Sequence, residues 1–276
     1  MTQAPDIDGA RRIDQLEQVW GSLTRLGHTI TGPEWDQPTA LPGWSVKDCY
    51  SHLVGLELGL LGEPTPEVDV DHLPHLRNPF AVSVEPWIEV RRATPGPEVL
   101  AEWEAVSARR LDALRALGDD DWSAVSSSPM GDVSYDAFME IRVFDSWMHE
   151  QDIRRAVGRS GHLEGPCAEL SVGRIRAALG FVVGKRAGAP DGTTVVFDVT
   201  GAAGTVVAIE VVDGRAREAA SVPSSPTTTL AMDVETFCAL GGGRWDGATA
   251  TANGRVQILG DRSVGDAVLA GMAITP

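Results

Sequence analysis

The stretch FDSWMHEQDIRR, residues 144–155, places a carboxylate and an imidazole four residues apart, at Asp145 and His149. In a helix this spacing puts both side chains on one face, one turn apart. Residues at steps of three and four predict that this face packs inward. The stripe consists of Phe138, Ile141, Asp145, Met148 and Asp152. Polar groups in such a stripe are costly unless something pairs with them, and a metal ion is one such partner.

A third ligand is predicted at His52, on a separate helix. The periodicity of residues 46–61 predicts a helix that begins after a Ser45 N-cap, with a carboxylate at Asp48 three residues on. His52 lies on the apolar side of this helix. Two imidazoles and one carboxylate suit zinc or another divalent ion and leave a coordination position open. Facing helices of a bundle commonly supply such ligands.

The residues around this trio have two interpretations. In one, Asp145 and His149 form a buried hydrogen bond that fixes the helices without any metal. In the other, Asp152 orients a ligand histidine by accepting its second ring N–H. Cys49, one turn before His52, is expected to be a small buried hydrophobe rather than a ligand.

Four long amphipathic segments predict a four-helix bundle in the first half of the chain. They span residues 13–31, 46–61, 98–117 and 135–157. Two long connections between these helices are predicted to be irregular: the first is rich in proline, and the second has no helical periodicity. These connections are residues 62–86, followed by a short helical stretch at 87–93, and residues 118–134.

The glycine-rich segment GRSGHLEGP, residues 158–166, breaks the helical pattern and predicts a domain boundary. We therefore expect a bundle domain at residues 1–160 and a small α+β domain at residues 167–276, in a multi-domain α and α+β protein. Segments rich in Val, Ile and Thr predict the strands of the second domain. Predicted strands span 194–200, 205–212, 227–232 and 254–259, and predicted helices span 167–186, 233–240 and 262–272.

The charge balance narrows the range of partners. The chain has 39 acidic and 23 basic residues, a formal net charge of -16. This argues against nucleic acid or an anionic membrane as the main partner, because both require a positive surface. Three scattered cysteines without a CxxC pair argue against a disulfide framework. With no signal-like or membrane-spanning apolar run, we expect a soluble cytoplasmic protein.

Three runs of sequence resemble the mycothiol-dependent maleylpyruvate isomerase family. They are LPGWSVKDCYSHL at residues 41–53, PHLRNPF at residues 74–80 and DSWMHEQDIRRAVG at residues 145–158. The resemblance implies a DinB-like four-helix bundle followed by a domain related to sterol carrier proteins. In the second half the matching features are GGR at residues 242–244 and ILGD at residues 258–261.

The resemblance also implies a ligand set. The family holds zinc with one histidine after its GW-S/T motif and with a carboxylate and a histidine four residues apart on the last bundle helix. Those positions are His52, Asp145 and His149 here. The family usually has Glu at the carboxylate position. Asp145 is one methylene shorter, so we expect it to reach zinc from a shifted backbone or through a water.

The chemistry that the resemblance implies depends on mycothiol as thiol cosubstrate. Zinc lowers the pKa of the thiol, and the thiolate attacks a small electrophile such as the alkene of maleylpyruvate. Arginines are expected to hold substrate carboxylates, and the candidates are Arg77, Arg244 and Arg255. We expect a zinc- and mycothiol-dependent S-transferase or isomerase, acting as a monomer or homodimer.

The sequence leaves a non-catalytic alternative open. A metal-stabilised bundle with a sterol-carrier-like second half is also suited to bind an apolar ligand without turnover. A third possibility, a protein–protein interaction module, requires a large exposed apolar patch.

Overall fold

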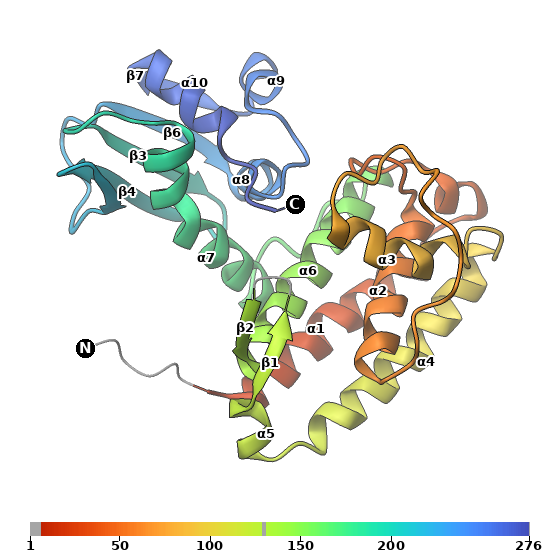
Figure 1. The fold of residues 1–276 in the computed structure, drawn as a ribbon. Helices are drawn as coiled ribbons and strands as arrows, with labels where there is room; N and C mark the ends of the chain where they lie inside the picture. Colours follow the sequence, from red (N-terminus) through yellow and green to blue (C-terminus); the bar gives the residue numbers. More distant parts are fainter. Residues whose placement is uncertain (1–6, 129–130, 276) are drawn as a thin grey trace. The chain divides into compact units, whose positions relative to one another are not determined.

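The computed structural model describes residues 7–128 and 131–275 of the chain. It divides into two compact units, Met1–Gly161 and His162–Pro276. The first unit is helical and the second contains a sheet (Figure 1). The predicted fold class, α followed by α+β, is therefore confirmed. Among the described residues, no helix combines the length and the apolar character needed to cross a membrane.

Four long helices build the first unit, as predicted. They are α1 (Gly9–Gly27), α2 (Val46–Leu60), α4 (Gly96–Arg115) and α6 (Tyr135–Ala156). α1 packs against α4 and α6, and α2 packs against the same two helices (Figure 1). Three tryptophans form the centre of this core, and each is at most 2% exposed: Trp20, Trp103 and Trp147.

The start of α2 is fixed by the predicted capping box. The Ser45 hydroxyl accepts from the backbone N–H of Asp48 at 3.3 Å. In return the Asp48 carboxylate accepts from the backbone N–H of Ser45 at 2.8 Å. Both bonds satisfy backbone donors that the first helical turn leaves free. This start sets the rotation of α2 and therefore the direction in which His52 points.

The predicted loops of the first unit contain ordered elements that the sequence analysis missed. η1 (Gly32–Asp36) is a short 3-10 helix after α1, and α3 (Pro79–Glu89) begins inside the predicted loop of residues 62–86. Asn78 caps α3, and Pro79 occupies its first turn, where a missing N–H costs nothing. The predicted loop of residues 118–134 holds α5 (Asp119–Ser123) and a hairpin of β1 (Val125–Ser128) with β2 (Gly131–Ser134).

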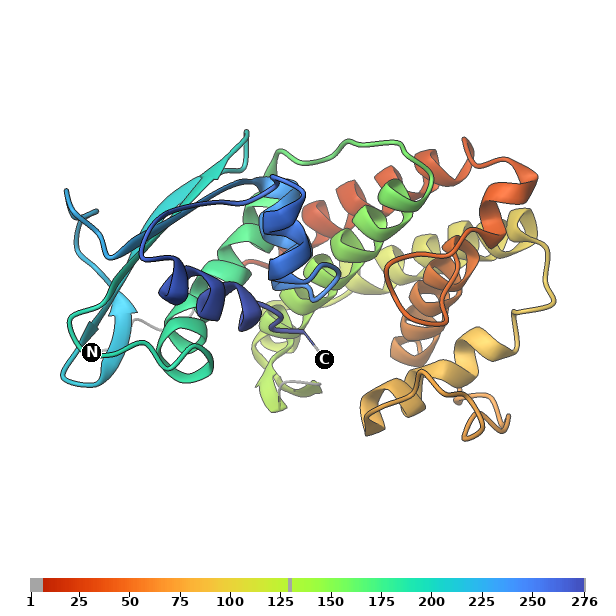
Figure 2. The same cartoon turned by 90° about the horizontal axis from the view of Figure 1, so that it is seen from above.

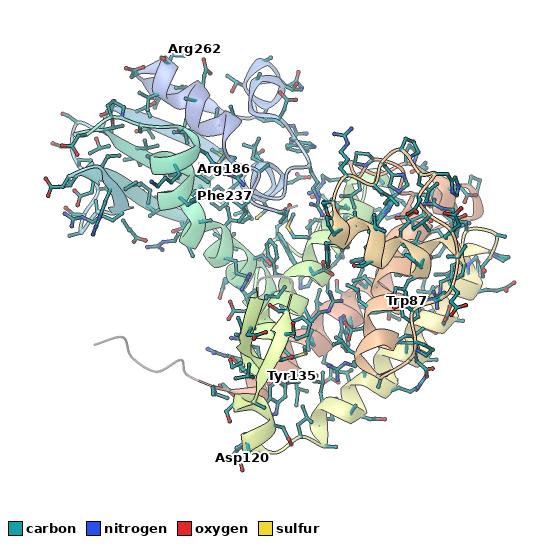
Figure 3. All side chains as sticks on the ribbon, in the orientation of Figure 1. Trp87, Asp120, Tyr135, Arg186, Phe237 and Arg262 are labelled. Atoms are coloured by element: carbon teal, nitrogen blue, oxygen red, sulfur yellow. The ribbon has the colours of Figure 1, made fainter. Side chains whose placement is uncertain are left out.

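α3 packs closely against α2 through Trp87, which Figure 3 labels. A Cβ on Gly55 of α2 would lie 2.2 Å from the Cβ of Trp87, far inside van der Waals contact. Any larger residue at position 55 would therefore push α3 away from α2. This close approach fixes the position of α3 and therefore determines which of its side chains face the loop before α2.

The second unit is a five-stranded sheet covered by helices. The strand order is β5-β4-β3-β6-β7, with β3 and β6 parallel and the other pairs antiparallel. The strands are β3 (Thr194–Thr200), β4 (Thr205–Val212), β5 (Arg215–Glu218), β6 (Thr228–Asp233) and β7 (Gln257–Gly260). Helices α7 (Pro166–Phe181), α8 (Val234–Gly241) and α10 (Arg262–Ala270) pack against this sheet (Figure 2). The predicted hairpin of residues 194–212 is confirmed, whereas β5 and the short α9 (Gly247–Ala252) were not predicted.

Candidate metal centre

Three side chains converge inside the helical unit. α2 contributes His52, and α6 contributes Asp145 and His149. Each offers one ligand atom, and these atoms all lie within 4.8 Å of one another. The two histidines are 2% and 5% exposed, whereas the Asp145 side chain keeps 23% of its surface exposed. The structure thus brings together the three residues that the sequence analysis predicts as ligands, and leaves one of them in reach of solvent.

The separations within this trio fit ligands that share one ion. Nε2 of His52 lies 3.5 Å from Oδ2 of Asp145, and Nε2 of His149 lies 3.6 Å from Oδ1. Both exceed the roughly 2.7–3.2 Å of an ordinary N–H···O hydrogen bond. Two donors bonded tetrahedrally to zinc at about 2.1 Å are about 3.4 Å apart. The spacing therefore favours a shared cation over the buried Asp–His hydrogen bond.

His52 supplies the second sign of fit. Neither of its ring nitrogens has a hydrogen-bond partner among the residues that the structure describes. An unsatisfied buried polar group costs about 1–3 kcal/mol. A cation bound to one of these nitrogens would offset that cost. Asp145 is one methylene shorter than Glu, yet it has a carboxylate oxygen within 3.6 Å of each imidazole. The donor set of two nitrogens and one oxygen is one that zinc accepts.

Asp152 lies beside the other nitrogen of His149. Its Oδ2 is 3.3 Å from Nδ1 of His149, and its Oδ1 accepts from Nη2 of Arg155 at 2.6 Å. Nε2 of His149 is thereby left facing Asp145. This is the arrangement expected of a carboxylate that orients a ligand histidine. Cys49 is fully buried, and burial raises the pKa of its thiol, consistent with its predicted role as a small hydrophobe.

The charges of the trio are strongly coupled. Burial lowers the pKa of His52 to about 4, against the opposing pull of Asp145. Burial also acts to lower the pKa of His149, but Asp145 and Asp152 outweigh it and hold that pKa well above its usual value. The pKa of Asp145 is held well below its usual value, because Arg142 and the two imidazoles outweigh the raising effect of burial. Without a metal, the cluster therefore contains a neutral His52, a protonated His149 and an ionised Asp145.

Arg142 is a neighbour of the trio that sequence reasoning missed. It donates to Oδ2 of Asp145 at 2.7 Å through Nη1. Its Nε and Nη2 both donate to Oε1 of Glu57, at 2.9 and 2.8 Å, and Arg110 donates to the other oxygen of Glu57 at 3.2 Å. Glu57, Arg110 and Arg142 are 0%, 2% and 4% exposed. The spacing of three residues between Arg142 and Asp145 was the available signal.

Trp44 is the second neighbour that the sequence analysis left without a role. Its ring centroid lies 4.9 Å from that of His52 and 5.6 Å from that of His149. The two imidazoles are 4.6 Å apart. Trp44 also lines a surface hollow of about 430 Å³ beside the start of α2. The loop before α2 therefore contributes one wall of the candidate centre.

Only part of the α6 stripe that was predicted to pack inward is buried in the structure. Phe138 and Ile141 are half-buried, whereas Met139, Val143 and Trp147 are fully buried on the neighbouring face. The prediction was wrong in the first half of α6, where the face of Met139 and Val143 packs inward instead, whereas residues 146–153 are buried on every side of the helix. Asp145 thus lies toward the edge of the core, which explains its partial exposure.

The three arginines predicted for substrate binding are divided between the two units. Arg77 is exposed in the loop that precedes α3. Arg244 belongs to the second unit, where its Nη1 donates to the carbonyl oxygen of Gly242 at 2.5 Å. Arg255, in the same unit, places its guanidinium 4.4 Å from the ring centroid of Trp245. Their roles toward a substrate stay predictions.

Comparisons with known proteins match both units. The family described as mycothiol maleylpyruvate isomerase N-terminal domain matches residues 16–154, half of the chain. The SCP-2 sterol transfer family matches residues 184–270. An uncharacterized protein of Mycobacterium tuberculosis is 25% identical over 138 residues, covering 49% of this chain and 52% of that protein. The chain thus spans about half the length of the curated relatives it matches.

Solved structures share the fold over most of the chain. A crystal structure of the mycothiol-dependent maleylpyruvate isomerase superimposes with a TM-score of 0.57 at 18% identity, covering 89% of this chain and 93% of that one. A mutant form of the same isomerase gives a TM-score of 0.56 at 17% identity, with coverage of 94% and 95%. At these identities the similarity concerns the fold, and the chemistry must be argued from the side chains.

Proposed function

Because the chain belongs to the mycothiol maleylpyruvate isomerase family, we propose that it is a zinc-dependent enzyme that uses mycothiol to convert a small electrophilic substrate by S-transfer or isomerisation. His52, Asp145 and His149 hold the ion. One observation carries this proposal: three ligand atoms lie within 4.8 Å of one another, and both nitrogens of the buried His52 lack a hydrogen-bond partner among the described residues.

A bound zinc ion supplies a Lewis-acid position that lowers the pKa of a thiol, so that thiolate forms near neutral pH. The remaining roles belong to the chain itself. The Asp152 carboxylate lies beside Nδ1 of His149 and attracts that side of the ring, so that Nε2 faces the ion. Arg142 fixes the Asp145 carboxylate through Oδ2 and leaves Oδ1 toward His149. His149 and Asp145 are thus oriented before the ion arrives.

The thiol cosubstrate reaches the ion from one side of the site. The two histidines are almost fully buried, and approach from solvent is open on the side of Asp145. Arg77 is the arginine that we propose for a substrate carboxylate, since it is exposed and belongs to the same unit. The three cysteines are buried and form no disulfide, which is consistent with the reducing cytoplasm in which a thiol cosubstrate stays reduced.

The test is conjugation of mycothiol by the zinc-loaded protein. Purified protein is incubated with mycothiol and each of a panel of electrophiles that includes maleylpyruvate, and loss of free thiol and formation of product are followed. We expect turnover with at least one electrophile, and none with His149→Ala loaded in the same way. A protein that holds zinc but turns over no member of the panel would favour the non-catalytic alternative.

A further inference from the structure

A second buried cluster lies next to the metal centre, around the carboxylate of Glu85 on α3. Its side chain is completely buried. Oε2 accepts from the indole Nε1 of Trp44 at 3.0 Å, and Oε1 accepts from Nη2 of Arg92 at 2.6 Å. Nε2 of His75 lies 3.2 Å from the same Oε1. Three separate segments therefore converge on one carboxylate: the loop before α2, the loop before α3 and the turn after α3.

The position of Glu85 follows from how α3 is docked. Trp87, two residues further on, packs where Gly55 of α2 has no side chain. Arg92 contacts both Glu85 and Asp48, the residue that completes the capping box of α2. The carboxylate is thus tied to the beginning of α2 on one side and to the body of α2 on the other.

Such a cluster is a poor way to gain stability. A buried ion pair gains little over apolar packing, because desolvation of the charges offsets their attraction. What the cluster does achieve is a fixed geometry for the indole of Trp44. A tryptophan that half-faces solvent is held in one orientation by a hydrogen bond to a buried anion, which is stronger than a bond to a neutral acceptor.

The other side of the same indole touches both ligand histidines. Its ring is inclined by 44° to that of His52 and by 33° to that of His149, at centroid distances of 4.9 and 5.6 Å. Among the described residues, His52 has no hydrogen bond that would set its ring rotation. Packing against Trp44 is therefore a principal restraint on this imidazole before an ion binds.

We propose that Trp44 is a positioning residue of the metal centre and that Glu85 is its anchor. Glu85 holds the indole, and the indole holds the imidazoles of His52 and His149 in the orientation that an ion requires. This inference rests on the proposed function only in that the trio binds a metal. It makes the affinity for zinc depend on a residue that contacts no ion.

The experiment measures zinc dissociation constants by competition with a chromophoric chelator, in the full-length chain. Trp44→Leu removes the ring, Trp44→Phe keeps a smaller ring without the N–H, and Trp35→Phe is the matched control. Trp35 is a buried tryptophan of the same region whose ring lies 5.3 Å from Tyr50. Loss of a residue that orients a metal ligand typically costs about 10–100-fold in affinity. We expect about tenfold weaker binding for Trp44→Leu, a smaller loss for Trp44→Phe, and no change for Trp35→Phe.

A double-mutant cycle tests whether Glu85 acts through Trp44. Glu85→Gln keeps an oxygen that accepts from the indole but removes the negative charge. If the carboxylate works by holding the indole, Glu85→Gln weakens zinc binding in the wild-type background and has no further effect in Trp44→Leu. Losses that simply add would overturn the anchoring role. Absorption spectra of the Co²⁺-substituted variants provide a second readout of ligand geometry.

The outcomes separate this inference from the proposed function. Suppose that the wild-type chain binds zinc and that both Trp44 variants, folded by circular dichroism, bind it equally well. The positioning role of Trp44 is then contradicted, whereas the assignment of the metal centre is unaffected. If the wild-type chain binds no zinc, the proposed function itself fails, and the inference fails with it.

Discussion

The cores of the two units differ in how many ionisable side chains they bury. The helical unit buries charged side chains throughout its core. The buried ionisable side chains of this unit are Arg12, Asp48, His52, Glu57, Glu85, Arg91, Arg110, Asp136, Arg142, His149, Glu150 and Asp152. In the described part of the α+β unit, the buried polar side chains are all hydroxyls: Ser171, Thr193, Thr228 and Thr236. Its core is made of apolar contacts such as that between Phe197 and Phe237, whose rings are 6.4 Å apart.

This difference indicates where chemistry is placed. Burying a charge is costly unless hydrogen bonds and partners offset it, and a hydrophobic replacement is often as stable. The α+β unit shows that this chain can build an apolar core. The charges of the helical unit therefore need a reason besides stability, and many of them surround His52, Asp145 and His149.

The largest expected effect comes from breaking the buried charge network. Arg142→Met removes the donor to both Glu57 and Asp145, so the buried carboxylate of Glu57 and the partly exposed carboxylate of Asp145 each lose a partner. We expect a loss of about 3–5 kcal/mol in the free energy of unfolding, measured by urea denaturation of the metal-free protein. A loss below about 1 kcal/mol would show that the network is well hydrated and would weaken the contrast between the units.

The second effect is a pH dependence that the apolar core lacks. The pKa of His52 is about 4 in the folded protein and 6.5 in the unfolded chain, where the imidazole is not buried. The unfolded chain therefore binds more protons than the folded one between pH 4 and pH 6.5. Stability therefore falls as the pH drops from 6.5 to 4. The pKa of His149 is shifted the other way, so the folded chain binds more protons above pH 6.5 and stability falls as the pH rises. Together the two histidines give the metal-free protein a stability maximum near pH 6.5.

Comparison with His52→Gln isolates the acid side of this maximum. The wild-type chain should lose on the order of 3 kcal/mol more than the variant between pH 6.5 and pH 4. Zinc should reverse the alkaline side, because binding requires His149 to release its proton and therefore strengthens as the pH rises. Parallel pH profiles for wild type and variant would argue against a neutral buried His52.

A smaller effect is stabilisation by zinc itself. At a free zinc concentration about 100 times the dissociation constant, binding should stabilise the folded protein by about 2.7 kcal/mol. The shift is read as a higher melting temperature that disappears with a chelator. Phe237→Leu, in the apolar core of the other unit, serves as the control: it lowers stability but keeps the zinc shift. A zinc shift of the same size in His149→Ala would mean that the ion binds elsewhere.

The smallest effect is expected from an ion pair at the surface of the α+β unit. Arg176 on α7 pairs with Glu218 on β5, and their side chains are 38% and 48% exposed. Exposed pairs contribute about 0–1 kcal/mol, because water screens the charges and both side chains lose freedom. Arg176→Ala should therefore change the free energy of unfolding by less than about 1 kcal/mol. A loss as large as that of Arg142→Met would remove the distinction between buried and exposed pairs.

The sequence predicted the convergence of His52, Asp145 and His149 because the signal was local. Asp145 and His149 are fixed by one helical turn, and His52 by a capping box whose two bonds form as expected. Arg142 was within reach of the same reasoning, three residues before Asp145. Its importance depends on Glu57, which comes from another helix and carries no pattern of its own.

The cluster around Glu85 was beyond sequence reasoning. It depends on α3 starting at Pro79 inside a proline-rich segment, and on Gly55 admitting Trp87 to the surface of α2. Both features depend on tertiary packing, which the periodicity of the sequence does not reveal. The hairpin β1–β2 was missed for a different reason: its first strand reads VSSS, without the alternation of apolar residues that marks a half-buried strand.

The central claim is that His52, Asp145 and His149 form one metal site. Elemental analysis of the purified wild-type protein beside His149→Ala, each checked for folding by circular dichroism, tests it most directly. The account predicts close to one zinc per chain in the wild type and almost none in the variant. Equal metal content in the two proteins, or none in either after zinc loading, would contradict it.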